Sequence, residues 1–293
     1  GQPLRGVNGS GTGVKGLNQA TAASRACAAT TFVCALGEDV GAQWARALAA
    51  ADGIHLHEQC SALPTGTAGI YVDHAGRNSI VIGAGANAAL SPAFIESQRT
   101  QIEASAVVLA QLESPIDAVA AALRIARARG VLTLLNPAPA NVVVPPELWA
   151  DVDVATPNET EFCAHLLHDC GEVMDPDLLG ACEDAELHSV CRRWQPAATV
   201  VVTLGASGCF ISHPAGNLRG DTAQHYRVPA AAVVPVDTTG AGDAFNGALA
   251  ASLARAPGRP FLDHVRFAGA YAGVSTEHAG AAISMPHADE VER

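Results

Sequence analysis

Residues 106–136 read "AVVLAQLESPIDAVAAALRIARARGVLTLLN", from Ala106 to Asn136. The apolar run 106–112 is typical of a strand that is buried on both faces, and the alanine-rich segment 116–129, which Gly130 stops, is typical of a helix. Residues 131–136 then predict a second buried strand. Strands that alternate with helices form mostly parallel sheets covered on both faces. This stretch therefore predicts an α/β fold.

The same alternation continues toward the C-terminus. Strands are predicted at 151–156, 199–205 and 209–212, and a long helix from 243 to about 256, on which Phe245, Leu249 and Leu253 share one face. Open α/β sheets bind ligands beyond the carboxyl ends of their strands. The polar residues that end these strands are therefore expected in one common site: Glu113, Asn136, Asn158 and Thr203.

Two segments near the N-terminus predict a small sheet separate from this core. Residues 67–73 and 78–82 are strand-like and flank a glycine-containing turn at 74–77, which indicates a hairpin. Residues 4–7 have the composition of a further strand of that sheet. We therefore expect small-sheet segments at 1–14 and 65–82, and an α/β core formed by 15–64 and 83–293.

Composition limits the kind of protein. The 293 residues carry a formal net charge of −12, which argues against nucleic-acid binding because such proteins present a basic face. No apolar run reaches the roughly 18 residues of a membrane span, and the first residues do not resemble a signal peptide. The eight cysteines form no C-x-x-C pair. We expect reduced, mostly buried thiols in a cytoplasmic protein without a zinc site.

Two glycine-rich stretches are candidates for binding phosphate: 9–19, "GSGTGVKGLNQ", and 237–247, "DTTGAGDAFNG". In the second, small residues precede a helix whose free N–H groups attract anions. Asp243 could be a plain N-cap there, but a second acid, Asp237, favours a site. The first lacks a preceding strand, and Lys15 is not followed by Ser or Thr as in a Walker A loop. It is either a flexible turn or, through Lys15 and Asn18, a site for a hydroxyl-rich small molecule.

Several motifs in order along nearly the whole chain resemble the ribokinases, within the larger family of carbohydrate kinases. These motifs are Ala84–Pro92, Gln111–Pro115, Asn136–Ala140, Thr156–Glu161 and Asp237–Asp243. The resemblance implies a three-layer α/β/α core with a small β-sheet lid. It also implies ATP-dependent phosphorylation of the 5-hydroxyl of D-ribose with Mg²⁺ and a monovalent cation, usually K⁺, and a homodimer paired through the lid.

The resemblance also implies roles for individual residues. Asp243 would be the general base, beside an anion hole formed by Thr239, Gly240, Ala241 and Gly242. Residues matching the family's sugar loop and its sugar-binding acid are Gly13, Val14, Lys15, Gly16, Leu17, Asn18 and Glu113, although an acid at 113 could instead be a helix cap. The first glycine-rich stretch would thus bind sugar and the second phosphate.

The remaining roles concern ATP and cations. Residues implied for ATP are Asn158, Thr203, Leu204, Gly205, Ala206, Ser207, Gly208, Gly242, Asp243 and Gly269. Glu161, with Asn158, would organise Mg²⁺ through water, and the alternative for this pair is a capping arrangement at a helix start. Residues implied for K⁺ are Asp237, Thr239, Ser275, His278, Gly280 and Ser284.

Two departures from the family pattern leave alternatives open. Val14 and Leu17 stand where the family has glycine and alanine, and both would add bulk beside the sugar. The family's first strand, with an Asn-x-Asp whose acid contacts the sugar, would precede Gly1. We expect the natural protein to have it; the alternative is a weak kinase. Other candidates are therefore a kinase for deoxyribose, a nucleoside or another sugar, and a catalytically silent sugar- or nucleotide-binding protein.

Overall fold

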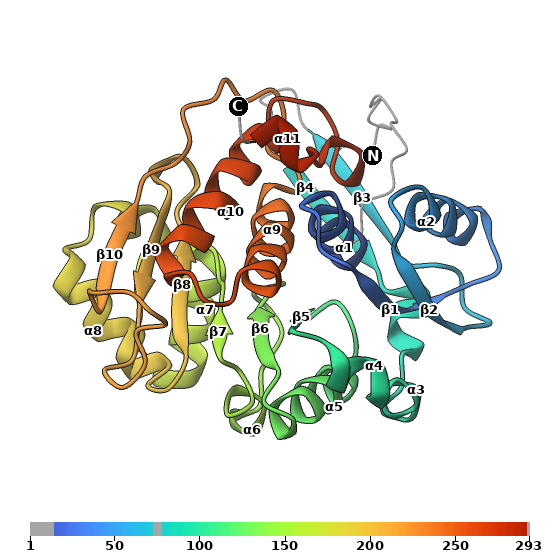
Figure 1. Cartoon of the computed structure of the whole chain (residues 1–293), viewed down its shortest axis with the longest axis horizontal. Coiled ribbons are helices and arrows are strands. Elements are labelled where there is room, and N and C mark those ends of the chain that lie inside the picture. Colours follow the sequence, from blue (N-terminus) through green and yellow to red (C-terminus); the bar gives the residue numbers. More distant parts are fainter. Residues whose placement is uncertain (1–14, 73–77, 292–293) are drawn as a thin grey trace, which may run out of the picture.

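A six-stranded sheet forms the centre of the molecule, with strand order β10-β9-β8-β7-β6-β5 (Figure 1). The structure is a computed structural model, and it describes residues 15–72 and 78–291. In these residues the strands are β1 (Thr31–Leu36), β2 (His55–Cys60), β3 (Thr67–Val72), β4 (Asn78–Gly83), β5 (Val107–Gln111), β6 (Leu132–Asn136), β7 (Val154–Ala155), β8 (Thr199–Thr203), β9 (Cys209–Ser212) and β10 (His225–Val228). The α-helices are α1 (Lys15–Arg25), α2 (Val40–Ala51), α3 (Pro92–Ser97), α4 (Arg99–Ala104), α5 (Ile116–Ala128), α6 (Pro146–Trp149), α7 (Glu159–Cys170), α8 (Asp184–Trp194), α9 (Ala241–Arg255), α10 (Phe261–Ser275) and α11 (Ala288–Val291).

Helices cover both faces of this sheet because its strands alternate their side chains between two cores. Leu135 packs in a cluster with residues of α5, α6, α7 and α8. Its neighbour Leu134 packs on the other side with residues of α1, α9 and α10. Strands β5 to β8 are parallel, and β9 and β10 are antiparallel additions at one edge. The predicted three-layer α/β/α core with a mostly parallel sheet is confirmed.

The strand pair β1–β2 extends the layer beyond β5 without joining its ladder. β1 and β2 are parallel to each other, and no hydrogen-bonded ladder links them to β5 within residues 15–72 and 78–291. The two parts are connected by side chains instead, since Ala35 of β1 and Val108 of β5 share one apolar cluster with α3, α4 and α5. The central layer is therefore divided between β5 and β1.

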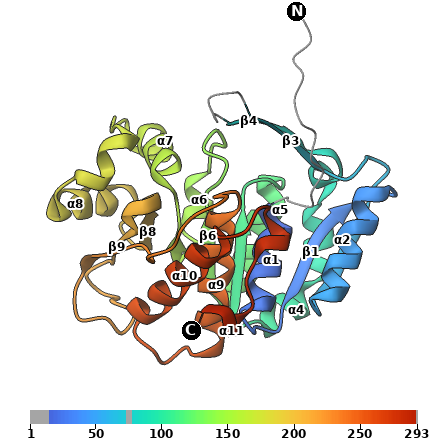
Figure 2. The same cartoon turned by 90° about the horizontal axis from the view of Figure 1, so that it is seen from above.

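The predicted hairpin is present and lies apart from the other two sheets (Figure 2). β3 and β4 pair antiparallel, with Ile70 opposite Ile80. The turn at 74–77 and the strand expected at 4–7 lie outside the described residues.

Three expectations need adjustment. The strand expected over 151–156 is reduced to Val154–Ala155, and the Asp153 carboxylate beside it accepts hydrogen bonds from the Thr133 N–H and hydroxyl. The long C-terminal helix, α9, begins at Ala241 rather than at Asp243. All eight cysteines are free, but only half are buried: Cys34, Cys163, Cys191 and Cys209.

Among the described helices, none has the length and apolarity needed to cross a membrane.

Candidate active site

The carboxylate of Asp243, the third residue of α9, is buried beneath helix α1. Its Oδ2 accepts a hydrogen bond from Asn18 Nδ2 at 2.8 Å, and its Oδ1 accepts one from Gln19 Nε2 at 3.1 Å. Lys15 Nζ lies 3.9 Å from Oδ1, and the Asp243 side chain is 5% exposed. Residues 225 positions apart in the sequence thus form one polar centre in an otherwise apolar helix interface.

The electrostatics of this centre favour proton acceptance by Asp243. Burial raises the pKa of its carboxyl, against the opposing effects of Lys15, Asn18 and Gln19. For Lys15, burial acts to lower the pKa of the ammonium, but the carboxylates of Asp243, Glu161 and Glu113 raise it by more. The site therefore holds a charged lysine beside a carboxylate that is more basic than an exposed aspartate.

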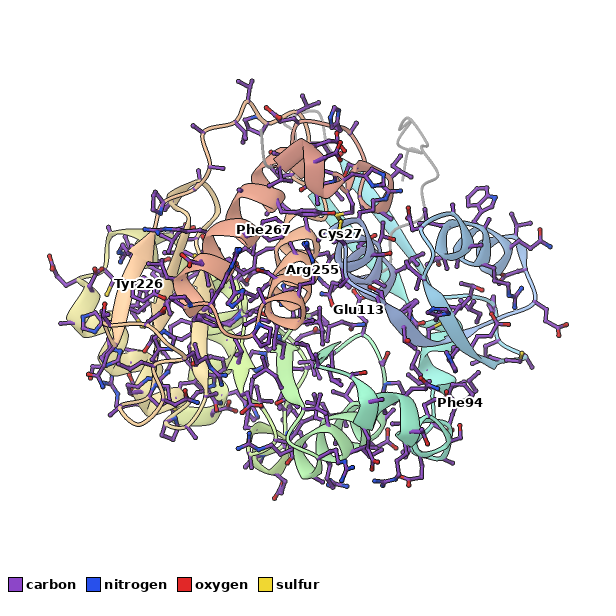
Figure 3. All side chains as sticks on the ribbon, viewed as in Figure 1. Cys27, Phe94, Glu113, Tyr226, Arg255 and Phe267 are labelled. Carbon is purple, nitrogen blue, oxygen red and sulfur yellow. The ribbon has the colours of Figure 1, made fainter. Side chains whose placement is uncertain are left out.

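Glu113 lies directly after strand β5 and next to helix α1 (Figure 3). Its Oε2 accepts a hydrogen bond from the backbone N–H of Lys15 at 3.3 Å, and burial raises the pKa of its carboxyl. The alternative role of a helix cap is wrong, because the N-cap of α5 is Pro115. The end of β5 and the start of α1 therefore meet at one acidic side chain.

The residues expected in a glycine-rich loop, Lys15 to Asn18, instead form the first turn of α1. The helix directs Lys15 and Asn18 toward Asp243, whereas Leu17 packs with Cys34 and Leu36 in an apolar cluster. The expectation that the Leu17 side chain adds bulk beside the sugar is thus corrected, because it lies in the core. Gly13 and Val14 are outside the described residues.

The N-terminus of α9 has no side-chain cap. Gly240 is the N-cap, with φ 79° in the left-handed region, so the alternative of Asp243 as N-cap is wrong. A Cβ on Gly240 would also lie 3.2 Å from the Ala281 Cβ, whereas one on Gly242 would meet no atom within 4 Å. Gly242 is exposed, and although the Ala241 N–H donates to the Thr238 carbonyl, this helix start is open where free N–H groups attract anions.

The loop before α9 is tied to the segment after α10 through Asp237. Its two carboxylate oxygens accept hydrogen bonds from the backbone N–H groups of Thr239 and Gly280, each at 2.9 Å. Hydrogen bonding lowers the pKa of Asp237 despite its partial burial. Ser284 donates to the Gly280 carbonyl at 2.8 Å. Four of the six residues expected at the K⁺ site are thus directly linked.

The other two expected K⁺-site residues lie in the same C-terminal segment but bond differently. Ser275 is buried at the end of α10, and its hydroxyl donates to the Ala272 carbonyl at 2.8 Å. His278 is exposed. Neither side chain hydrogen-bonds Asp237, so the structure brings only the other four together through direct contacts.

Asn158 and Glu161 form a capping box at the start of α7. Asn158 Oδ1 accepts from the Glu161 N–H at 2.8 Å, and Glu161 Oε2 accepts from the Asn158 N–H at 2.9 Å. The capping alternative is therefore correct as a description of the local geometry. Glu161 is also buried, which raises the pKa of its carboxyl, and the nearby Asp243 carboxylate acts in the same direction.

The turn from Thr203 to Gly208 joins β8 to β9, as expected of a strand-end turn. Thr203 is bridged to Asn158, which confirms that these two strand ends are neighbours. A polar cavity of about 350 Å³ lies against the turn and is lined by Glu159, Asp177 and Ser207, among others. Its two acids disfavour phosphate, so the uncapped end of α9 is the better phosphate position. Gly269 lies in α10, and a Cβ at this position would meet no atom within 4 Å.

Three polar residues at the centre were not given a role by the sequence. Gln19 lies four residues after Lys15, a spacing that places both on one helix face. Thr156 donates to Asn246, and Asn246 donates to the Gly242 carbonyl at 2.8 Å, which supports the first turn of α9. Gln19 carries a usable signal in its spacing, whereas Thr156 and Asn246 meet only through tertiary packing.

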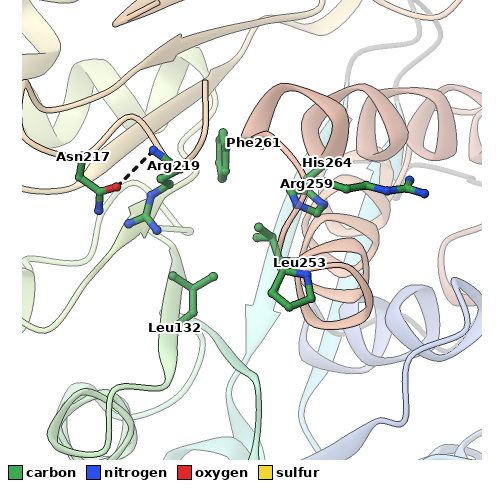
Figure 4. A pocket seen from close by; sticks show the side chains of 8 residues that line it. Leu132, Asn217, Arg219, Leu253, Arg259, Phe261 and His264 are labelled. Carbon is green, nitrogen blue, oxygen red and sulfur yellow. Dashed lines mark hydrogen bonds between the residues drawn. The ribbon is translucent and has the colours of Figure 1, made fainter. Parts of the chain in front are cut away.

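A second cavity lies near the amino ends of the parallel strands (Figure 4). It measures about 200 Å³, and its lining includes Leu132, Arg219 and His264. Leu132 begins β6, whereas Asn136 ends it, so this cavity adjoins the amino ends of the parallel strands. Ligand sites in such sheets are found at the carboxyl ends, where Asp243, Glu113 and Asn136 lie.

Comparisons with known proteins agree with this geometry. The family model described as the pfkB family carbohydrate kinase matches residues 9–288. A ribokinase of Haemophilus influenzae is 34% identical over 286 residues, which are 95% of this chain and 85% of that protein. The structure of ribokinase from Giardia lamblia is similar with a TM-score of 0.86 and 26% identity, and the match covers 100% of this chain and 90% of the other.

A further solved structure is similar over most of its length. The ribokinase of Arabidopsis thaliana, complexed with ribose and ATP, matches with a TM-score of 0.81 and 26% identity over 96% of this chain and 86% of that one. The sequence motifs, the three-layer core and the match over residues 9–288 all indicate the same relationship. The chain belongs to the pfkB family of carbohydrate kinases.

Proposed function

We propose that the protein transfers the γ-phosphoryl group of ATP to the 5-hydroxyl of D-ribose, giving D-ribose 5-phosphate and ADP. The observation that carries this proposal is a buried carboxylate, Asp243, at the uncapped N-terminus of α9 with a lysine 3.9 Å away. The Asp243 carboxylate can thus accept a proton while the adjacent backbone N–H groups of α9 bind an anion. The similar ribokinase complexed with ribose and ATP supports the choice of both substrates.

Asp243 is the general base in this proposal. Its carboxylate takes the proton of the sugar hydroxyl as that oxygen forms a bond to the γ-phosphorus and the bond to ADP breaks. The transition state of such transfers is loose, so positioning and charge neutralisation supply most of the rate acceleration. The N–H groups of the Thr239–Gly242 segment and the first turn of α9 stabilise the charge on the transferring group.

The sugar is bound on the α1 side of Asp243, by Lys15, Asn18 and Glu113. Gly13, Val14 and Gly16 are assigned to the same sugar site by their match to the family's sugar loop. Asn18 supports this assignment, since its Nδ2 is bonded to Asp243 while its buried Oδ1 has no hydrogen-bond partner among the described residues. A buried carbonyl oxygen without a donor is unfavourable, and a sugar hydroxyl would satisfy it. Glu113 supplies a further acceptor for hydroxyl groups.

ATP is bound between the N-terminus of α9 and the turn 203–208, with Asn158 and Gly269 as further contacts. Asn158 and Glu161 offer only oxygen donors, which suits a hard cation that keeps several waters, and they would hold Mg²⁺ through water. When bound, Mg²⁺ neutralises charge on the phosphates of ATP. The capping box restrains the Glu161 carboxylate, because its Oε2 accepts the Asn158 N–H.

A monovalent cation, K⁺, would be held by the linked loops around Asp237. Its donors would be oxygens of the backbone and of carboxylates, from Asp237, Thr239, Ser275, His278, Gly280 and Ser284. Its binding would keep the loop before α9 rigid. The hydrogen bonds from Thr239 and Gly280 to Asp237 supply the same restraint from the protein itself.

Asp237→Ala should remove this restraint. We expect kcat to fall by about 10-fold and its increase with K⁺ to be lost, because a small displacement of the anion-binding loop misplaces the phosphoryl group. Steady-state rates at 0 and 100 mM K⁺, with sodium as the counter-ion control, measure both effects. Asp263→Asn, on the exposed side of α10, is the matched control. Full K⁺ activation in the Asp237 variant would contradict the cation assignment.

ADP release with a panel of acceptors tests the proposed function itself. We expect turnover on D-ribose to exceed that on 2-deoxyribose, fructose and adenosine by about 10-fold or more, since a site built to bond hydroxyls rejects analogues that lack one. Turnover confined to a nucleoside or to deoxyribose would change the substrate. Absence of turnover with every acceptor, together with measurable ATP binding, would indicate a silent binding protein.

The quaternary structure belongs to the same proposal. The hairpin β3–β4, with segments 1–14 and 65–82, would form a lid over the sugar, and 15–64 with 83–293 would form the kinase core. Two lids would pair in a cytoplasmic homodimer. Sedimentation of the full chain tests the dimer, and a monomeric enzyme with full activity would exclude a catalytic need for it.

A further inference from the structure

The side chain of Gln19 connects three elements of the site. It is buried, and its Nε2 lies 3.1 Å from Asp243 Oδ1 in α9 and 3.2 Å from Asn136 Oδ1 at the end of β6. An amide nitrogen carries two N–H groups, so one glutamine can donate to both acceptors at the same time. The backbone of Gln19 belongs to α1, so this one side chain bonds α1 to both α9 and β6.

The connection continues from Asn136 to the other side of the site. The Asn136 side chain donates to the Thr156 carbonyl at 2.9 Å. It also acts to lower the pKa of the buried Glu161 carboxyl, against the larger effect of burial. Two neutral amides, Gln19 and Asn136, thus lie between two buried carboxylates, Asp243 and Glu161. Like charges in a buried site repel each other, and each amide donor stabilises the carboxylate that it faces.

The geometry points to Gln19 as a positioning residue: its amide holds the Asp243 carboxylate in the orientation that accepts the proton of the sugar hydroxyl, and ties that orientation to Asn136 at the end of β6. This role rests on the function proposed above. Gln19 does not touch the reacting atoms, and it acts through Asp243. Asn18 fixes Oδ2 and Gln19 fixes Oδ1, so that loss of either bond would let the carboxylate rotate about its χ2 angle.

The charged groups that face Asp243 come from three elements: Lys15 from α1, Glu113 from the end of β5 and Glu161 from α7. None of them replaces the hydrogen bond of Gln19 to Oδ1, since Lys15 Nζ lies at 3.9 Å and the acids repel the carboxylate. The Gln19 hydrogen bond stabilises the charged form of Asp243. Its removal should therefore raise the pH below which the base becomes protonated.

Gln19→Met tests the proposal, because methionine has a similar length and flexibility but no N–H donor. We expect kcat with ribose to fall by about 10- to 100-fold, with the KM values for ribose and ATP changed by less than about threefold. The acid limb of the kcat–pH profile should move to higher pH. Gln19→Leu should give the same pattern, because it removes the same two hydrogen bonds.

Thr21→Val is the matched control in the same helix. Thr21 is fully buried, and its hydroxyl has no hydrogen-bond partner among the described residues, so valine should leave kcat and the pH profile unchanged. Folded Gln19→Met with wild-type kcat and an unmoved acid limb would overturn the proposal. Loss of the fold in both Gln19 variants would also overturn it, by assigning the residue to stability. An inactive wild-type enzyme would instead refute the proposed function, before any variant is compared.

Discussion

Asp243→Asn is expected to lower kcat for ribose phosphorylation by roughly 10²–10⁴-fold, the contribution typical of general base catalysis. Asparagine has nearly the same shape, but only its Oδ1 accepts hydrogen bonds, so one of the bonds from Asn18 and Gln19 is kept and the other is lost. The apolar contacts of α1 with α9 should persist. Asparagine has no basic oxygen that could take the proton of the sugar hydroxyl. Rapid-quench measurement of ADP formation at saturating ATP isolates this step from product release.

Two further measurements separate a lost base from a lost fold. Equilibrium binding of ATP should change little, because the first-turn N–H groups of α9 are kept. The charge change itself should not lower the stability of the variant at neutral pH. Burial raises the pKa of the Asp243 carboxyl, so its ionised form destabilises the folded state above that pKa. Asparagine is uncharged and removes this penalty. A variant that turns over ribose at the wild-type rate would eliminate Asp243 as the base.

The sequence was informative wherever the signal was local or periodic. The strand, helix and strand of residues 106–136 predict the α/β core, because a buried parallel strand and an amphipathic helix have different apolar periods. The small residues before α9 likewise predict its uncapped N-terminus. The rule that ligands gather at carboxyl strand ends correctly placed Asn158 beside Thr203. The family resemblance, rather than this rule, associated Glu113 with Lys15, whose backbone N–H it accepts.

The sequence was uninformative where long-range packing decides. Glycines are typical of turns, so the sequence predicts a loop for Lys15 to Asn18. These residues form a helix instead, and the helix contacts α9 and Glu113. The direction of Leu17 depends on that helix, and a loop gives no basis for predicting it. The spacing of Gln19 from Lys15 indicates a shared helix face, but its role depends on Asn136 and Asp243, which are 117 and 224 residues away. The break between β5 and β1 also has no local signal.

Gly247→Ala is expected to destabilise the protein and inactivate it together. Gly247 is in the middle of α9, where alanine would ordinarily be favoured over glycine by about 1 kcal/mol. Here a Cβ would lie 2.4 Å from the Gln19 carbonyl oxygen and 2.6 Å from the Ala22 Cβ. Backbone cannot yield as a flexible side chain can, so α1 must move away from α9, and we expect a net loss of about 2 kcal/mol in the free energy of unfolding.

The same displacement should reach the chemistry, because α1 carries Lys15, Asn18 and Gln19 to Asp243. A shift of about 1 Å at a reacting group typically lowers the rate by about 10²-fold. Urea denaturation and kcat therefore should change together in Gly247→Ala. Gly258→Ala is the matched control, since a Cβ there meets no atom within 4 Å. A Gly247 variant with wild-type stability and activity would show that the contact between α1 and α9 does not set the position of the base, and that the centre is assembled by other restraints.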